Sequence, residues 1–179
     1  MKGRDGMPSR TSVNIKRTKE METAISLAAL MLAGASAVPA LAADECNTVP
    51  GLTAAGAPLG FHGVDPVAFL DIGNRIDGTA KFTAVYDRVA YYFASQENMN
   101  AFKRSPAKYA PAYGGFCTLG VSVGKKFDGD PKFAGVRNGK LYDFVNKEIF
   151  RMYQKDKDGA IAKAEKNWKE IQHKSSREL

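Results

Sequence analysis

Three side chains in this sequence are of types that bind soft metal ions: Cys117, His62 and Cys46. A cysteine thiolate favours Cu(I) or Zn(II), and copper binds most tightly among the divalent ions. His62 is the one histidine in the central part of the chain, which makes it the best imidazole candidate. These residues predict a metal site with Cys117 and His62 as main ligands, which Cys46, a methionine or a side chain of a partner would complete. Copper is the first choice of ion and zinc the second.

The same side chains are open to other interpretations. Cys117 is also expected as a small buried apolar residue, or as one half of a disulfide with Cys46. A lone histidine is more often a packing or surface residue than a ligand. Met99 and Met152 are thioether candidates, although methionine at helical spacing is usually part of a core. Asp65 precedes a proline and is expected to cap a helix.

Catalysis has little support in the sequence. We find no Ser/His/Asp set, no H-E-x-x-H motif and no phosphate-binding glycine loop. A thiol enzyme built on Cys117 and His62 is a third interpretation, behind metal binding and a structural role. We therefore predict that the protein is not an enzyme.

The elements that must position these residues follow from local patterns. A helix is predicted after Asp65-Pro66, and strands over 81–87 and 88–94 are expected to form a hairpin that turns near Asp87. Ser95 then predicts the start of a helix whose buried side holds Met99, Phe102 and Tyr109.

The second part of the domain follows a glycine-rich turn before Cys117. Asn138-Gly139 separates strands over 133–137 and 140–145, and this dipeptide is typical of a type I′ hairpin. A helical pattern runs from 146, is broken at Asp158-Gly159 and resumes over 160–171. We find no internal repeat. The predicted fold class is α+β, a small single domain in which two hairpins form an antiparallel sheet packed with several helices.

Three stretches of the sequence together resemble the exported branch of the YHS-domain family. They are "GFHGVDPVAFL", "FTAVYDRVAYYFASQENMNAFKRSPAKYAPAYGGFC" and "DGDPKFAGVRNGKLYDFV", and the likeness runs from about Gly60 to Trp168. The family's elements G-x-D-P-V-A-[YF], aromatic-x-F-x-S and Y-x-P-x-Y-G-G-[YF]-C fall on 63–69, 91–95 and 109–117.

The resemblance implies a metal-handling module. Compact members of the family carry cysteines at a strand-to-helix corner in a pattern like F-C-S-x-x-C, but Ala94 and Asn98 stand at those positions here. Only Cys117 matches a family cysteine that could bind metal. The prediction is an exported YHS-type domain that binds copper as an accessory or carrier, with a metal-handling protein as a further partner. The alternative is a non-catalytic structural or protein-interaction module with a Cys46–Cys117 disulfide and no metal.

The N-terminal residues are typical of a cleaved export signal. Lys16, Arg17 and Lys19 precede an apolar stretch over 24–38, and Pro39 is followed by the small-x-small pattern Ala40-Leu41-Ala42. Cleavage after Ala42 predicts a periplasmic or secreted protein with no membrane attachment. The domain organisation expected is a signal peptide over 1–42, an extended segment over 43–59, a YHS-like domain over 60–172 and a polar tail over 173–179.

Charge gives no support to nucleic-acid binding. The full chain has 179 residues and a net charge of +7, and loss of residues 1–42, with six basic and three acidic residues, leaves a net charge of +4. The remaining lysines are scattered along the sequence rather than clustered. Only two cysteines are present, and neither belongs to a C-x-x-C motif, so thioredoxin-like chemistry is not expected.

Overall fold

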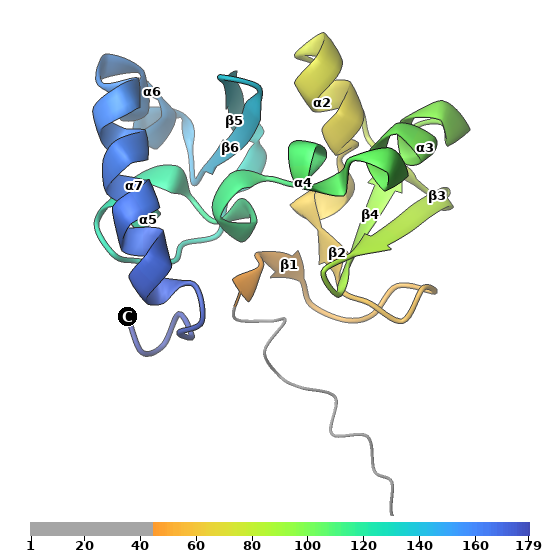
Figure 1. The fold of residues 1–179 in the computed structure, drawn as a ribbon, viewed down its shortest axis with the longest axis horizontal. Coiled ribbons are helices and arrows are strands. Elements are labelled where there is room, and N and C mark those ends of the chain that lie inside the picture. The colour runs from red at the N-terminus through yellow and green to blue at the C-terminus, as the bar shows by residue number, and fades with distance from the viewer. Residues whose placement is uncertain (1–44) are drawn as a thin grey trace, which may run out of the picture. The chain divides into compact units, whose positions relative to one another are not determined.

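The computed structural model describes residues 45–179, so the predicted signal peptide and its cleavage site lie outside the described residues. This part of the chain contains six α-helices, a four-stranded mixed sheet and a separate two-stranded sheet (Figure 1). The predicted α+β class is therefore confirmed. No helix among these residues is long and apolar enough to cross a membrane.

The elements follow one another in two successive series. The first comprises β1 (Thr48–Val49), β2 (Leu59–Gly60), the 3₁₀ turn η1 (Phe61–Gly63), α2 (Pro66–Ile72), β3 (Thr79–Tyr86), β4 (Val89–Phe93), α3 (Gln96–Arg104) and α4 (Pro106–Tyr109). The second comprises η2 (Ala112–Gly115), α5 (Thr118–Ser122), β5 (Asp130–Arg137), β6 (Lys140–Phe144), α6 (Lys147–Lys155) and α7 (Lys157–Ile171).

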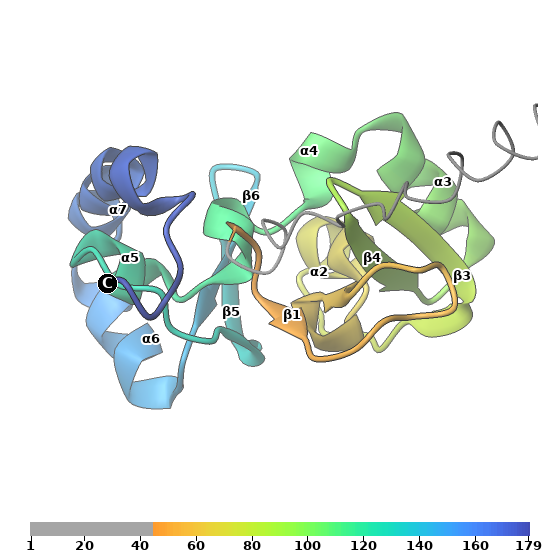
Figure 2. The same ribbon diagram turned by 90° about the horizontal axis from the view of Figure 1, so that it is seen from below.

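Both predicted hairpins form, but they lie in separate sheets rather than in one. The first sheet has the order β1-β2-β4-β3, in which β2 runs parallel to β4 through the pair Leu59–Ala90. Strands β5 and β6 form a two-stranded sheet of their own. Figures 1 and 2 show the β3–β4 hairpin toward one end of the domain and the β5–β6 hairpin nearer its middle, with α6 and α7 beyond it. The segment expected to be merely extended thus contributes two short strands to the first sheet.

Helix starts are where the sequence places them. The Oδ1 atom of Asp65 accepts hydrogen bonds from the N–H groups of Val67 and Ala68 at 2.8 and 3.0 Å, and Pro66 takes the first helical position. The Oγ atom of Ser95 accepts from the N–H of Asn98 at 3.2 Å at the start of α3. Both predicted caps are confirmed, and Asp65 has the structural role expected of it.

The two hairpin turns have left-handed backbone at both central residues. The φ values are 52° at Asn138 and 70° at Gly139, and 48° at Asp87 and 65° at Arg88. This is the conformation of a type I′ turn, whose twist matches that of the flanking strands. The predicted turn positions are therefore confirmed.

One predicted boundary is wrong. The break in the C-terminal helical region lies at Asp156, between α6 and α7, rather than at Asp158-Gly159. The Oδ1 atom of Asp156 accepts a hydrogen bond from the N–H of Gly159 at 2.9 Å, so this aspartate caps α7. Gly159 then belongs to the first turn of the new helix, where its low helix propensity costs little.

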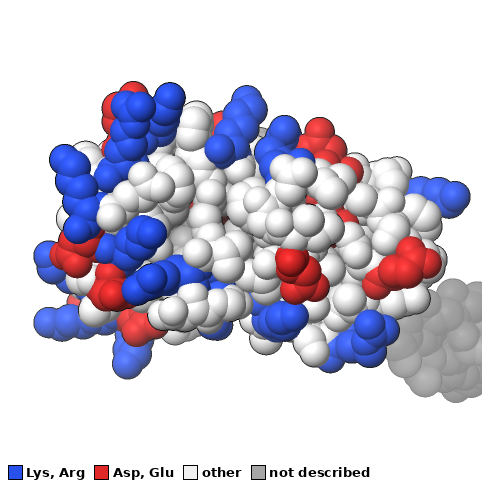
Figure 3. All heavy atoms as spheres, turned by 90° about the horizontal axis from the view of Figure 1, so that it is seen from above, with Lys and Arg blue, Asp and Glu red and all other residues white. Residues whose placement is uncertain are grey.

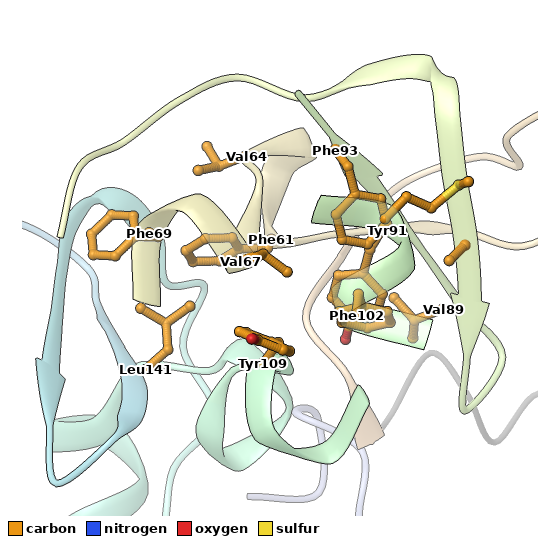
Figure 4. Close-up of a cluster of buried hydrophobic side chains, with 12 residues drawn as sticks. Phe61, Val64, Val67, Phe69, Val89, Tyr91, Phe93, Phe102, Tyr109 and Leu141 are labelled. Atoms are coloured by element: carbon orange, nitrogen blue, oxygen red, sulfur yellow. The ribbon is translucent and has the colours of Figure 1, made fainter. Parts of the chain in front are cut away.

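Two clusters of buried side chains form the core. The first joins α2, β3, β4 and α3 and includes Phe93 and Phe102 (Figure 4). The second lies among η2, α5, β6, α6 and α7 and includes Phe144 and Tyr153. Leu141 of β6 belongs to the first cluster, although its strand neighbours Tyr142 and Phe144 belong to the second. Strand β6 therefore contributes to both clusters, with alternate residues on opposite faces.

Charged side chains of both signs are interspersed on the face shown in Figure 3. The middle of this face is largely uncharged, and no single basic stripe crosses it. The distribution agrees with the scattered lysines of the sequence. It offers no electrostatic footprint for a nucleic-acid backbone on this face.

Candidate functional site

A turn with left-handed backbone, just before Phe116, determines the position of Cys117. Tyr113, Gly114 and Gly115 have φ values of 53°, 63° and 83°, which reverse the chain before Phe116. The N–H of Cys117 then donates to the carbonyl oxygen of Phe127 at 2.9 Å, and its backbone forms a bridge with that of Asp143. Cys117 is buried, stands at the N-cap of α5 and makes no capping hydrogen bond through its side chain. Its side chain packs within the second core cluster.

A pocket of about 260 Å³ lies beside Cys117. Its lining comes from α5, the segment after it, the end of β6 and α6, and consists of Cys117, Leu119, Gly120, Ser122, Val123, Phe127, Val145, Ile149 and Met152. Gly120 allows the Phe127 ring to pack closely, because a Cβ there would lie 2.7 Å from Phe127 Cδ2. The lining contains two sulfur atoms and no histidine, aspartate or glutamate.

Met152 differs from the usual methionine at helical spacing. It is 57% exposed on α6 and lines the pocket, whereas Met99 is buried in the first core cluster. The core position expected for Met99 is confirmed, and that expected for Met152 is wrong. Spacing alone could not distinguish them, because both lie on helices that follow a hairpin. Tyr153, the buried residue of α6, packs in the second core cluster, whereas Met152 next to it lines the pocket.

His62 lies apart from this pocket. Its Nε2 atom is 3.0 Å from Oδ1 of Asp128, an oxygen that also accepts a hydrogen bond from Asn47 at 2.7 Å. Asn47 further donates to the carbonyl oxygen of Gly115 at 3.1 Å. His62 thus joins the first series of elements to the segment before β5. The other histidine, His173, is exposed and pairs with Glu45 at 2.7 Å.

The thiol of Cys46 forms a thiolate less readily than an ordinary cysteine does. Burial raises the pKa of its thiol to about 11, and the charges of Asp87 and Glu45 act in the same direction. Both cysteines are free, and they pack against different core clusters, Cys46 against the first and Cys117 within the second. The disulfide expected in the alternative interpretation is not formed in the structure.

The structure does not bring Cys117, His62 and Cys46 together as one ligand set. Within residues 45–179 no group of three or more histidine, cysteine, aspartate or glutamate side chains could hold a metal ion. The thiol–imidazole pair of the enzyme interpretation has no support either, because no imidazole lines the pocket beside Cys117. Of the three predicted ligands, Cys117 alone lines this pocket.

Asp143 is a buried carboxyl group that sequence reasoning missed. It is 1% exposed, and its Oδ1 atom has no hydrogen-bond partner among residues 45–179. Burial raises its pKa well above the usual value, and the nearby charges of Asp130 and Asp128 raise it further. The neighbouring Thr118 Oγ1 is also buried without a partner. An aspartate in the strand pattern Leu141–Phe144 reads as solvent-facing, so the sequence gives no signal for this burial.

Comparisons with known proteins leave the resemblance as a prediction. No family model, no curated protein and no solved structure matches the chain.

Proposed function

We propose that this protein is an exported domain that binds Cu(I) in the pocket beside Cys117, with Met152 as the second sulfur ligand. The observation that supports the proposal is the composition of the pocket, in which a buried thiol and an exposed thioether share an otherwise apolar lining. Thiolate and thioether sulfurs are soft ligands that select Cu(I). Export rests on the signal peptide predicted over residues 1–42.

Charge balance favours Cu(I) over a divalent ion. One thiolate neutralises one positive charge, so a Cu(I)–thiolate pair is neutral and is tolerated in an apolar pocket. A zinc ion bound by the same two sulfurs would keep a net positive charge, and burying an unpaired charge is costly. Mg(II) and Ca(II) require oxygen ligands that the pocket lacks. The pocket therefore suits a monovalent soft ion.

The exposed side chain of Met152 offers an ion a route into the pocket. Its side chain is unbranched and flexible, so it can move over the pocket mouth without movement of α6. Cys117 is 1% exposed and lies deeper. An ion would meet the thioether first and then the thiol. This order suits a carrier, in which a weak outer ligand passes the ion to a stronger inner one.

The rim of the pocket suits contact with a protein that delivers or receives the ion. Val123, Phe127 and Val145 are exposed apolar side chains around the opening, together with Met152. Exposed apolar groups gathered around one opening are typical of interaction sites. The same rim favours a second candidate function, a protein-interaction module that binds no metal.

A Cu(I) titration of the reduced protein against a coloured Cu(I) chelator tests the proposal. We expect one equivalent of Cu(I) in the wild type, loss of this binding in Cys117→Ser, and an affinity lowered on the order of 10-fold or more in Met152→Leu. Cys46→Ser and His62→Ala are the matched controls and should bind as the wild type does. Absence of stoichiometric binding by the wild type would favour the interaction module. Loss of binding in Cys46→Ser and His62→Ala as well as in Cys117→Ser would return the site to the residues first predicted.

A further inference from the structure

The two series of elements in this domain repeat one another. Each has a 3₁₀ turn, a short helix, a hairpin and a longer helix, and two residues separate the hairpin from the longer helix. The 3₁₀ turns and short helices are related by a shift of 52 residues, since α2 begins at Pro66 and α5 at Thr118. The hairpins and the helices after them are related by a shift of 51, since β3 begins at Thr79 and β5 at Asp130.

The agreement extends to irregular features. The isolated bridge Val64–Asp77 corresponds to the bridge Phe116–Asp128. Both hairpins have an irregularity in register at the same place, between Thr79 and Thr83 in one and between Asp130 and Gly135 in the other. Such features are not required by the element order, because a hairpin forms as well without them. Their recurrence indicates one folding unit used twice.

Backbone conformations that L-residues rarely adopt also recur. Phe61, His62 and Gly63 have φ values of 48°, 49° and 78°, and the residues 52 positions later, Tyr113 to Gly115, are also left-handed. Two non-glycine residues with positive φ before the first short helix are uncommon. Their counterpart in the second series again includes a non-glycine residue, Tyr113.

The sequence carries a trace of the same repeat. When the two series are aligned with these shifts, several paired positions hold identical residues. They are Gly63 and Gly115, Asp77 and Asp128, Gly78 and Gly129, Lys81 and Lys132, Phe82 and Phe133, Val85 and Val136, Tyr91 and Tyr142, Phe93 and Phe144, and Glu97 and Glu148. The change of shift by one residue between the short helix and the hairpin hides the repeat from a search at one fixed period.

The repeat places Asp65 and Cys117 at one and the same position. In the first copy the Asp65 carboxylate is fully buried and accepts four hydrogen bonds, from the N–H groups of Val67, Ala68 and Ala94 and from the side-chain amide of Asn98. In the second copy the residues that correspond to Ala94 and Asn98 are Val145 and Ile149, which line the pocket beside Cys117. Met152 corresponds to Ala101.

We infer that the domain consists of two diverged copies of one unit, and that the Cys117 pocket is the corner that Asp65 and Asn98 close in the first copy. In the first copy the Asp65 carboxylate accepts hydrogen bonds from the Asn98 amide and from backbone N–H groups, so the corner is filled. In the second copy a thiol and apolar side chains leave it open. Ligand binding is thereby confined to one of two equivalent corners. The Cu(I) part of this inference rests on the proposed function, whereas the equivalence of the corners does not.

A cycle of substitutions tests the equivalence without any metal. Cys117→Asp alone places a carboxylate in an apolar corner, and Ile149→Asn alone places an amide there. Together they rebuild the Asp65–Asn98 pair, so the double variant should melt at a temperature higher than the sum of the single effects predicts, by roughly 3 °C or more. The reverse cycle, Asp65→Cys with Asn98→Ile, should show the same sign, because the second change removes an amide that the first leaves without its acceptor.

The possible outcomes distinguish the duplication of the unit from the binding of Cu(I). Positive coupling in both cycles supports the duplication, and additive or negative coupling in both overturns it, as does failure of a double variant to fold where its first single variant folds. Positive coupling in only one cycle would overturn the equivalence of the two corners. A folded Cys117→Asp/Ile149→Asn protein should also lose Cu(I). If the wild type binds no Cu(I) while both cycles show coupling, the proposed function fails and the duplication stands.

Discussion

Asp65 and Asp143 are both buried aspartates, but their surroundings differ. The carboxylate of Asp65 accepts four hydrogen bonds, so both of its oxygen atoms have partners. Asp143 has an Oδ1 atom without a partner, and burial together with Asp130 and Asp128 raises its pKa well above the usual value. The neutral acid is therefore the form of Asp143 that the fold stabilises.

This difference predicts a pH dependence of stability. Below the usual aspartate pKa of 3.8, Asp143 is protonated in both folded and unfolded states and carries no penalty. As the pH rises above this value the unfolded state loses the proton while the folded state retains it, so stability falls until the folded pKa is passed. The free energy of unfolding of Asp143→Asn relative to wild type should therefore rise by up to about 1.4 kcal/mol per pH unit in this window.

Denaturant unfolding across the acid and neutral range measures this effect. Asp130→Asn serves as the control, because removal of its charge lowers the pKa of Asp143 and should reduce the pH-dependent loss only in part. A constant difference between Asp143→Asn and wild type at all pH values would show that Asp143 ionises normally.

Cys46 gives a second prediction at the scale of single residues. Its pKa of about 11, against an ordinary value of 9.0, leaves on the order of 100-fold less thiolate near neutral pH than an ordinary cysteine has. In a Cys117→Ser background, alkylation by iodoacetamide should be slow in the native protein and fast in denaturant, as followed by mass spectrometry. Equal rates in the two states would contradict the burial of Cys46 against the first core cluster.

At the scale of elements, the hairpin turns are the features most strongly set by local sequence. Asn138 and Gly139 both have left-handed backbone, and a β-branched side chain resists this conformation. Gly139→Val should therefore lower the free energy of unfolding by on the order of 1–3 kcal/mol. Thermal or chemical denaturation measures the change. Asn138→Gly is the control and should be tolerated, and equal stability of Gly139→Val and wild type would contradict the turn geometry.

Local signals explain which parts of the fold could be predicted. The caps at Asp65 and Ser95 and the turn at Asn138-Gly139 depend on residues within a few positions of one another, so the sequence contains the whole determinant. The sequence prediction put the helix break at Asp158-Gly159 because Asp156 and Asp158 could each cap a helix. Only the hydrogen bond from the N–H of Gly159 to Asp156 decides between them.

The candidate site depends on contacts between distant residues, and much of it could not be predicted. Whether Cys117 meets His62 is decided by the partner of His62, Asp128, which lies 66 positions away. The pairing of Leu59 with Ala90 likewise has no local signal. Cys117 is a candidate that the sequence alone offers, whereas the positions of Met152 and Asp143 follow from the packing of α6 and β6.

At the scale of the whole domain, β6 connects the two halves of the structure. Leu141 enters the first core cluster (Figure 4). Tyr142 and Phe144 enter the second cluster, and Val145, just after the strand, lines the pocket. Asn47 and the His62–Asp128 pair add polar links between the same regions. Neither half has a complete core without this strand.

The shared strand has a consequence for amide exchange. Because Leu141 fills space in the first core, opening of the second half exposes apolar surface in the first, and we expect slow-exchanging amides of both halves to share one opening free energy. An ion bound beside Val145 would then slow exchange in β4 as well as in β6. The first copy, whose own corner is closed by Asp65, would thus report on the occupancy of the second.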